Sequence, residues 1–196
     1  MASAKIDEAF SLFDDYNRLD PNSLTYGGLI YPNEYFYSLK LYEWVIKLVP
    51  EASTTLLLAS RCQHIGRWEI SRESYPEGKA GYLRWRADLA KHHAALAGKL
   101  LKEAGYSDPE IEDVQRIVLK QKLRTDEEVQ MMENALCLVF LQYQFEDFLA
   151  KHDDDDKMIR ILRKTWDKMS EPGRREALSL PFSGRTLSLV QRAVAG

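Results

Sequence analysis

Apolar residues recur along most of this chain at intervals of three and four positions, which is the period of a helix with one buried face. The stretch from residue 32 to 48 is typical, because it opens on Pro32-Asn33-Glu34 and places apolar or aromatic side chains at Tyr37, Leu41, Trp44, Val45 and Leu48. The same period predicts further helices near residues 6–20, from 50 into the 60s, and over 82–104, 108–122, 125–150 and 153–169, followed by shorter pieces. No stretch alternates apolar and polar residues in the two-residue period of a strand. The pattern therefore predicts one all-α helical bundle, a single domain over residues 1–196.

Start and stop signals support these boundaries. Gly105 stands where a glycine commonly ends a helix in the left-handed conformation. Asp108-Pro109-Glu110 places a proline and two acids in a first helical turn, and Thr125 to Glu128 resembles a capping box. Residues 25–32, with two adjacent glycines, and residues 71–81 are expected to be loops.

Composition narrows the class of protein. A chain of 196 residues can bury one substantial core without needing two domains, and 45% hydrophobic with 29% charged residues is ordinary for a globular protein. The net charge of -3 argues against a nucleic-acid partner and leaves anion binding to a local site. No apolar run approaches the roughly twenty residues of a membrane span, and the first residues lack a secretory signal pattern. Cys62 and Cys137 lack metal-type spacing and are expected to be buried free thiols, so we expect a cytoplasmic protein without a membrane partner.

Two helices each deliver a histidine to the edge of an apolar face. The first ends in Arg61-Cys62-Gln63-His64-Ile65-Gly66-Arg67-Trp68, and the second carries His92-His93 inside an apolar run. His92 and His93 point about 100° apart on a helix, so at most one of them faces a given site. The arrangement predicts a pocket that serves as a metal or catalytic site.

Arginines and aromatic residues gather between these two histidine-bearing segments. Arg61 and Arg67 flank His64 and are the best candidates to clamp an anion, because a guanidinium group can hold phosphate or carboxylate in a bidentate way. Arg84 and Arg86 face different sides of a helix, so only one of them is expected to reach the same pocket. Trp68 or Tyr82 could pack against the organic part of a ligand. Ordinary surface salt bridges are the competing explanation of this cluster.

Several of these segments resemble known families. The apolar helix ending at Ala59 to Gly66, the run from His93 to Tyr106, and Glu133-Asn134-Ala135 resemble segments of the HD-type metal-dependent phosphohydrolases. More specifically, the chain resembles a bacterial and fungal family filed as domain of unknown function 4202. The residues that carry this second resemblance are Arg61 to Ile65, Arg67-Trp68, Gly81 to Arg86, Cys137 to Leu141, Lys164 to Trp166 and Lys168 to Ser170. The resemblances imply an HD-like fold with a divalent metal.

The chain departs from the HD-type pattern at the residues that bind metal. The usual His-Asp pair is replaced by Gln63-His64, and the last acidic ligand would fall at Glu133 or Asn134. What the resemblance leaves as a candidate ligand set is Glu34, His64, His93 and Glu133. Two imidazoles and two carboxylates would suit Zn, Mn or Fe.

The two carboxylates of this set also have ordinary structural explanations. An acid at Glu34, in a first helical turn, stabilises the helix dipole without any other role. Glu133 lies in an apolar helix, where a buried carboxylate must be paired or hydrogen-bonded.

These observations lead to a metal-dependent hydrolase of a small phosphorylated or anionic metabolite, a class that includes nucleotides. His64, Arg61 and Arg67 would act in catalysis, and Arg61, Arg67, Trp68, Tyr82, Arg84 and Arg86 would form the substrate-binding set. Metal-dependent oxidation stays open within the enzyme class. The alternative is a non-catalytic module that binds an anion or nucleotide on a degenerate HD-like fold. A third class is a scaffold that forms a homodimer through its apolar C-terminal helices.

Overall fold

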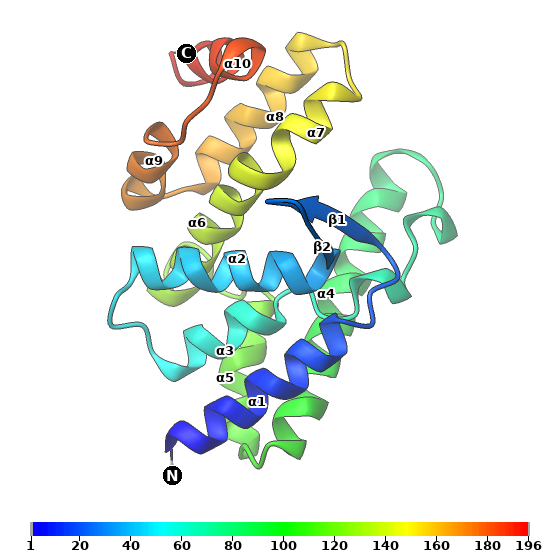
Figure 1. The fold of residues 1–196 in the computed structure, drawn as a ribbon, viewed down its shortest axis with the longest axis vertical. Coiled ribbons are helices and arrows are strands. Elements are labelled where there is room, and N and C mark those ends of the chain that lie inside the picture. The colour runs from blue at the N-terminus through cyan, green and yellow to red at the C-terminus, as the bar shows by residue number, and fades with distance from the viewer. Residues whose placement is uncertain (1, 196) are drawn as a thin grey trace.

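Helices make up most of the computed structural model of the chain, which describes residues 2–195 (Figure 1). The N-terminal part contains α1 (Ala2–Asn17), α2 (Asn33–Leu48), α3 (Thr54–Cys62), α4 (Gly78–Glu103) and α5 (Asp108–Val118). The C-terminal part contains α6 (Glu127–Val139), α7 (Phe145–Ala150), α8 (Asp155–Lys168), α9 (Glu171–Leu178) and α10 (Gly184–Val194). Short 3₁₀ turns at Arg67–Glu69 and Arg72–Ser74 lie between α3 and α4. The predicted helical class is confirmed.

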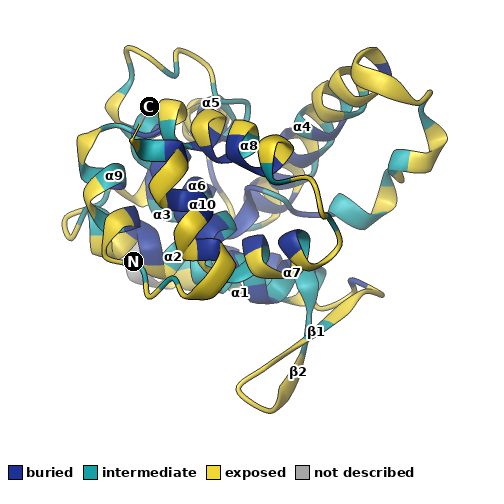
Figure 2. Ribbon diagram, turned by 90° about the horizontal axis from the view of Figure 1, so that it is seen from above, coloured by how far each residue is buried: buried dark blue, intermediate teal, exposed yellow. Residues whose placement is uncertain are grey.

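The helix α6 joins the two parts of the molecule. It packs against α2 and α5 on one side and against α8 and α9 on the other. Met132, Ala135 and Leu138 of α6 are fully buried in the continuous core that runs through both parts. Figure 2 shows this helix inside the molecule, surrounded by helices with exposed outer faces.

Residues 25–32, which were expected to be a loop, belong to a small two-stranded sheet. The strands β1 (Ser23–Tyr26) and β2 (Leu29–Pro32) form an antiparallel hairpin in which Tyr26 pairs with Leu29. Gly27 and Gly28 both have positive φ, at 57° and 81°, which is the turn that two-residue hairpins prefer. The sequence pattern missed the hairpin because it projects from the body with both faces largely exposed (Figure 2), so no alternation of polarity was needed.

The helix ends follow the predicted signals only in part. The helix α4 begins at Gly78, inside the expected loop over 71–81, and α6 is capped by the Asp126 side chain rather than by a capping box from Thr125. Gly105 has φ of 81°, and Ser107 forms a capping box with Glu110 at the start of α5. The helix α5 ends at Val118 rather than near Lys122, and a turn follows it. The expected helix over 125–150 is interrupted by a π-helical segment at Phe140–Gln144.

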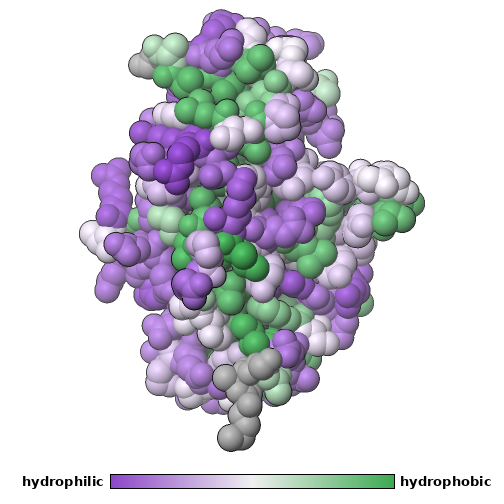
Figure 3. Space-filling view, turned by 60° about the vertical axis from the view of Figure 1, so that its left-hand side comes forward, coloured by the Kyte–Doolittle hydropathy of each residue, from purple (hydrophilic) through white to green (hydrophobic). Residues whose placement is uncertain are grey.

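The C-terminal helices leave an apolar recess at the surface. It is lined by side chains of the π segment and of α8 to α10, namely Leu141, Leu162, Trp166, Met169, Ala177, Phe182, Val190, Ala193 and Val194. On the face shown in Figure 3, hydrophobic surface gathers at the end of the molecule that holds the C-terminus. Within residues 2–195, none of the helices combines the length and the apolar character that crossing a membrane requires. Both cysteines are buried free thiols, as predicted.

Candidate functional site

The turn that follows α3 brings the two predicted histidines together. Gly66 has φ of 67°, and a Cβ atom on it would lie 2.7 Å from Cδ2 of Leu96 and 2.9 Å from Nε2 of His92. This position therefore requires glycine both for its backbone conformation and for the close approach of α4. The ring centroids of His64 and His93 lie 5.7 Å apart as a result.

Both of these histidines favour the neutral form. Burial lowers the pKa of His93 from 6.5 to about 4, with the nearby charge of Arg67 adding to the effect. Burial also lowers the pKa of His64 well below its usual value, and the charges of Arg67 and Lys120 act in the same direction. His93 Nδ1 lies 2.6 Å from the carbonyl oxygen of Ile65. Because a carbonyl oxygen only accepts, Nδ1 carries the proton and Nε2 of His93 keeps its lone pair.

Glu34 occupies the first turn of α2, directly after the hairpin. Its backbone N–H donates to Oδ2 of Asp20 at 3.0 Å, and its side chain is almost wholly buried. Burial raises the pKa of Glu34 to about 8, although Arg67 Nε, 3.6 Å from Oε1, acts in the opposite direction. The carboxyl group is thus held in an environment that favours its protonated form at neutral pH.

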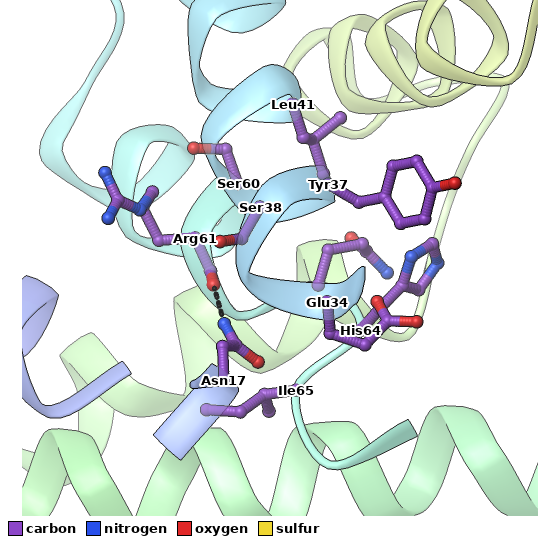
Figure 4. Close-up of a pocket in the computed structure, with 10 residues that line it drawn as sticks. Asn17, Glu34, Tyr37, Ser38, Leu41, Ser60, Arg61, His64 and Ile65 are labelled. Carbon is purple, nitrogen blue, oxygen red and sulfur yellow. Dashed lines mark hydrogen bonds between the residues drawn. The ribbon is translucent and has the colours of Figure 1, made fainter. Parts of the chain in front are cut away.

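Glu34 and His64 line the same pocket, between α2 and the end of α3 (Figure 4). The pocket has room for about one water-sized group, roughly 10 Å³. Its walls are mainly polar side chains of the first three helices and the turn after α3, and the full set is Asn17, Glu34, Tyr37, Ser38, Leu41, Ser60, Arg61, Gln63, His64 and Ile65.

Three positive charges act on His64. Arg67 is held over the Trp85 ring, with its Cζ 5.4 Å from the ring centroid, while it also pairs with Glu34. Arg86 is exposed on α4, yet its charge acts on His64, as well as on the second histidine. Lys120 adds a third cation. The set of Arg67, Arg86 and Lys120, hereafter the cation cluster, makes this side of the site attractive to an anion.

Two of these positions bear on the sequence-based expectations. Arg84 and Arg86 do diverge, as the helical period predicts, and the charge of Arg84 acts on Tyr75 rather than on His64. Lys120 was missed, because it stands in the turn after α5 with φ of 54°, outside any recognisable motif. Its place in space depends on how α5 packs against α3 and α6.

Glu133 lies on the α6 side of the cation cluster and is engaged by lysines. Lys120 Nζ donates to Oε2 of Glu133, and Lys168 Nζ lies 3.6 Å from Oε1. Although burial acts to raise it, the pKa of this carboxyl is lowered by the two lysines and by Arg86. Its neighbour Asn134 faces elsewhere, since its amide bonds to the backbone N–H and hydroxyl of Ser170. Of the two candidates that the sequence left open, Glu133 is the one that faces the cation cluster.

The remaining predicted substrate residues contact other parts of the chain. The Arg61 guanidinium donates to Asp14 and packs over the ring of Phe10, and Figure 4 shows it pointing away from His64 and Glu34. Trp68 packs beside Tyr16, with ring centroids 5.8 Å apart. Tyr82 is exposed and accepts a 3.4 Å hydrogen bond from Arg86.

The four predicted metal ligands differ in whether their side chains are free to bind an ion. His93 Nε2 and the neutral His64 ring could both donate to a metal. Glu133 is already paired with Lys120 and Lys168, however, and Glu34 with Arg67. Across residues 2–195, no three side chains of the His, Cys, Asp or Glu type come close enough together to hold one ion. In this arrangement the two predicted carboxylate ligands are engaged by cations, and the two imidazoles are the donors that remain.

Comparison with known proteins places the chain in a family. The family model described as Domain of unknown function (DUF4202) matches residues 7–190, which is most of the chain, and confirms the more specific of the two resemblances. No curated protein matches the chain significantly, and no solved structure does so either.

Proposed function

The chain belongs to this family of domains of unknown function, and from the geometry of its site we propose that it binds a small phosphorylated or otherwise anionic metabolite. The observation that carries the proposal is the cation cluster beside two histidines, defined above by Arg67, Arg86 and Lys120. Guanidinium and ammonium groups pair with phosphate oxygens through charge-assisted hydrogen bonds. A neutral histidine can add one more donor without adding charge.

The exposed position of Arg86 provides a clean test of anion binding. Arg86→Ala should weaken the binding of ethyl phosphate by about tenfold or more, since a hydrogen bond to a charged group contributes about 1.5–3 kcal/mol. Arg84→Ala is the matched control, because Arg84 is also exposed on α4 but acts on Tyr75. Isothermal titration calorimetry measures both. Equal affinities for the two variants would remove the cation cluster from any role in binding.

Metal-dependent hydrolysis of the same kind of metabolite is the second candidate. It is favoured by one observation, the free lone pair on His93 Nε2 beside the neutral ring of His64. Zn, Mn or Fe would be the metals to look for, although the present arrangement offers no complete ligand set. Elemental analysis of untagged protein tests it, with His64→Ala and His93→Ala as comparisons. Bound metal that is lost in both folded variants would support hydrolysis, and no metal after refeeding would rule against it.

An HD-like architecture is proposed on the same grounds. It is supported by the meeting of α2, the end of α3, α4 and α6 around one site, which are the segments that the resemblance singles out. A cytoplasmic location is supported by the two buried, unpaired thiols. A homodimer through the C-terminal helices is supported by their apolar recess together with exposed Leu178 and Leu187. Light scattering over a concentration series tests the homodimer.

A further inference from the structure

Two buried amide oxygens in the wall of the pocket lack a hydrogen-bond donor. Asn17 is 1% exposed and Gln63 is 3% exposed, and both side chains line the pocket that also contains Glu34. No donor among the described residues reaches Oδ1 of Asn17 or Oε1 of Gln63. A buried polar atom without a partner is costly, and in a pocket wall it indicates that the partner comes from outside the chain.

The orientation of both amides is fixed by their nitrogen atoms. Asn17 Nδ2 donates to the carbonyl oxygen of Arg61 at 3.3 Å, as Figure 4 shows. Gln63 Nε2 donates to the carbonyl oxygen of Val118 at 3.0 Å. Turning either amide over would place two oxygens against each other, so the unpartnered atoms must be the oxygens. What these two amides lack is therefore a donor and not an acceptor.

Charge is distributed unevenly along this site. Near the two amides lie the carboxyl group of Glu34 and, behind it, Asp20, whose negative charge acts on Glu34. Around His64 lies the cation cluster. The Glu34 end of the site thus offers unpartnered oxygen acceptors and acids, while the neighbouring end offers cations, and the two ends meet where Arg67 contacts Glu34 at 3.6 Å. Arg61 Nε also lacks a partner, but its guanidinium group points away from Glu34 (Figure 4).

We propose that the acceptor end is a subsite for a primary ammonium group, so that the ligand carries an amine a short linker away from its phosphate. The subsite rests on the proposed function, because the phosphate is assigned to the cation cluster. An ammonium group donates up to three hydrogen bonds, and the residues that line this pocket include Glu34 and the two amides whose oxygens lack a donor. It is also close in size to a water molecule, and the pocket admits about one such group, roughly 10 Å³.

A matched pair of ligands tests the subsite directly. O-phosphoethanolamine and ethyl phosphate share the phosphate and the two-carbon chain and differ only in the amine. Calorimetric titration of the wild-type protein should show the amine-bearing ligand binding about tenfold more tightly or better. Binding of the amine-bearing ligand should also release more protons than binding of ethyl phosphate, because the ammonium group favours the ionised form of Glu34. Repeating the titrations in buffers of different ionisation enthalpy measures the number of protons released.

Variants show whether the amide oxygens are responsible. Gln63→Met should reduce the preference for the amine to less than about threefold while leaving ethyl phosphate binding nearly unchanged. Gln115→Met is the matched control, because Gln115 also donates its amide N–H to a backbone carbonyl, that of Ala94 at 2.8 Å, but does not line the pocket. The control should keep the full preference.

Each of the other outcomes overturns either the amine subsite or the anion site. Equal affinity for the two ligands in the wild-type protein would mean that an ordered water occupies the acceptor end, and the subsite would fall while the anion site stands. The preference for the amine can also be measured in potassium chloride and in choline chloride of equal ionic strength. If it disappears only in potassium chloride, the acceptor end is a site for a metal cation and not for an ammonium group. If neither ligand binds, the anion site proposed above fails, and the subsite with it.

Discussion

His93 on α4 bonds to the carbonyl oxygen of Ile65, 28 residues earlier, through Nδ1 at 2.6 Å. This one contact ties the turn that carries His64 to the long helix that carries the second imidazole. It also fixes which nitrogen of His93 faces the site. Structure and candidate chemistry therefore depend on the same hydrogen bond.

Removing the His93 side chain should cost stability as well as function. His93→Ala should lower the free energy of unfolding by about 2–4 kcal/mol, because it leaves a cavity and deprives the Ile65 carbonyl of its donor. His92→Ala is the comparison, since His92 is partly exposed and pairs with Glu69 at 2.8 Å. It should cost about 1 kcal/mol or less. Urea denaturation measures both, and equal losses would contradict the role given to His93.

Glu34 should give the protein an unusual pH dependence. Its pKa is about 8 in the folded chain against an ordinary 4.5, so the folded state binds an extra proton between these pH values. Stability should therefore fall as pH rises from 4.5 to 8 and change no further from this group above pH 8. Glu34→Gln should remove that slope and be more stabilising at pH 8 than at pH 5.

The control for this pH effect is the difference in stability between Glu34→Gln and the wild-type protein at each pH. The pKa of His93 is lowered, which makes stability rise with pH between 4 and 6.5, opposite in sign to the effect of Glu34. Comparing Glu34→Gln with wild type at each pH cancels the histidine contribution. A difference between the two proteins that is constant from pH 5 to 8 would show that Glu34 has an ordinary pKa.

Lys120 should matter to folding as well as to the charge of the site. Lys120→Met leaves the buried carboxylate of Glu133 with Lys168 alone, so it should destabilise the protein by about 2–4 kcal/mol and raise the pKa of Glu133. Lys122→Met is a closely matched control, because Lys122 also has a positive φ, of 56°, but is exposed. Thermal unfolding of the two variants should separate them clearly. A loss of similar size in both would assign the effect to the left-handed backbone instead.

A glycine on α9 should be irreplaceable for a steric reason. A Cβ atom on Gly173 would lie 2.7 Å from Cγ of Asn134, whose amide is held by two hydrogen bonds to Ser170. Gly173→Ala should therefore destabilise the protein by about 1–3 kcal/mol, although alanine favours helices. In the background of Asn134→Gly, which also removes the Cβ atom 2.9 Å from that of the new alanine, the same substitution should cost much less, which a double-mutant cycle measures. A stabilising Gly173→Ala would show that the two helices can separate freely at this point.

The chain's own pattern was sufficient for most of the fold and for part of the site. Helical periodicity, Gly105 and the Asp108-Pro109-Glu110 helix start are local signals, and the helices they predicted are present. The divergence of Arg84 and Arg86 follows from 100° per residue and needed no tertiary information. The hairpin was missed because strand periodicity reports burial on one face, and this hairpin is exposed on both.

Tertiary structure alone decided which residues share the site. The sequence determined that Arg61 and Arg67 flank His64, but only packing could turn Arg61 toward Asp14 and leave Arg67 beside Glu34. It determined an acid near position 133, whereas the packing of α5 on α6 supplied Lys120 as its partner. The physical reason is that periodicity records whether each side chain faces the core, which is a property of single elements. Contacts between distant elements depend on how those elements pack, and one chain's periodicity carries no record of that.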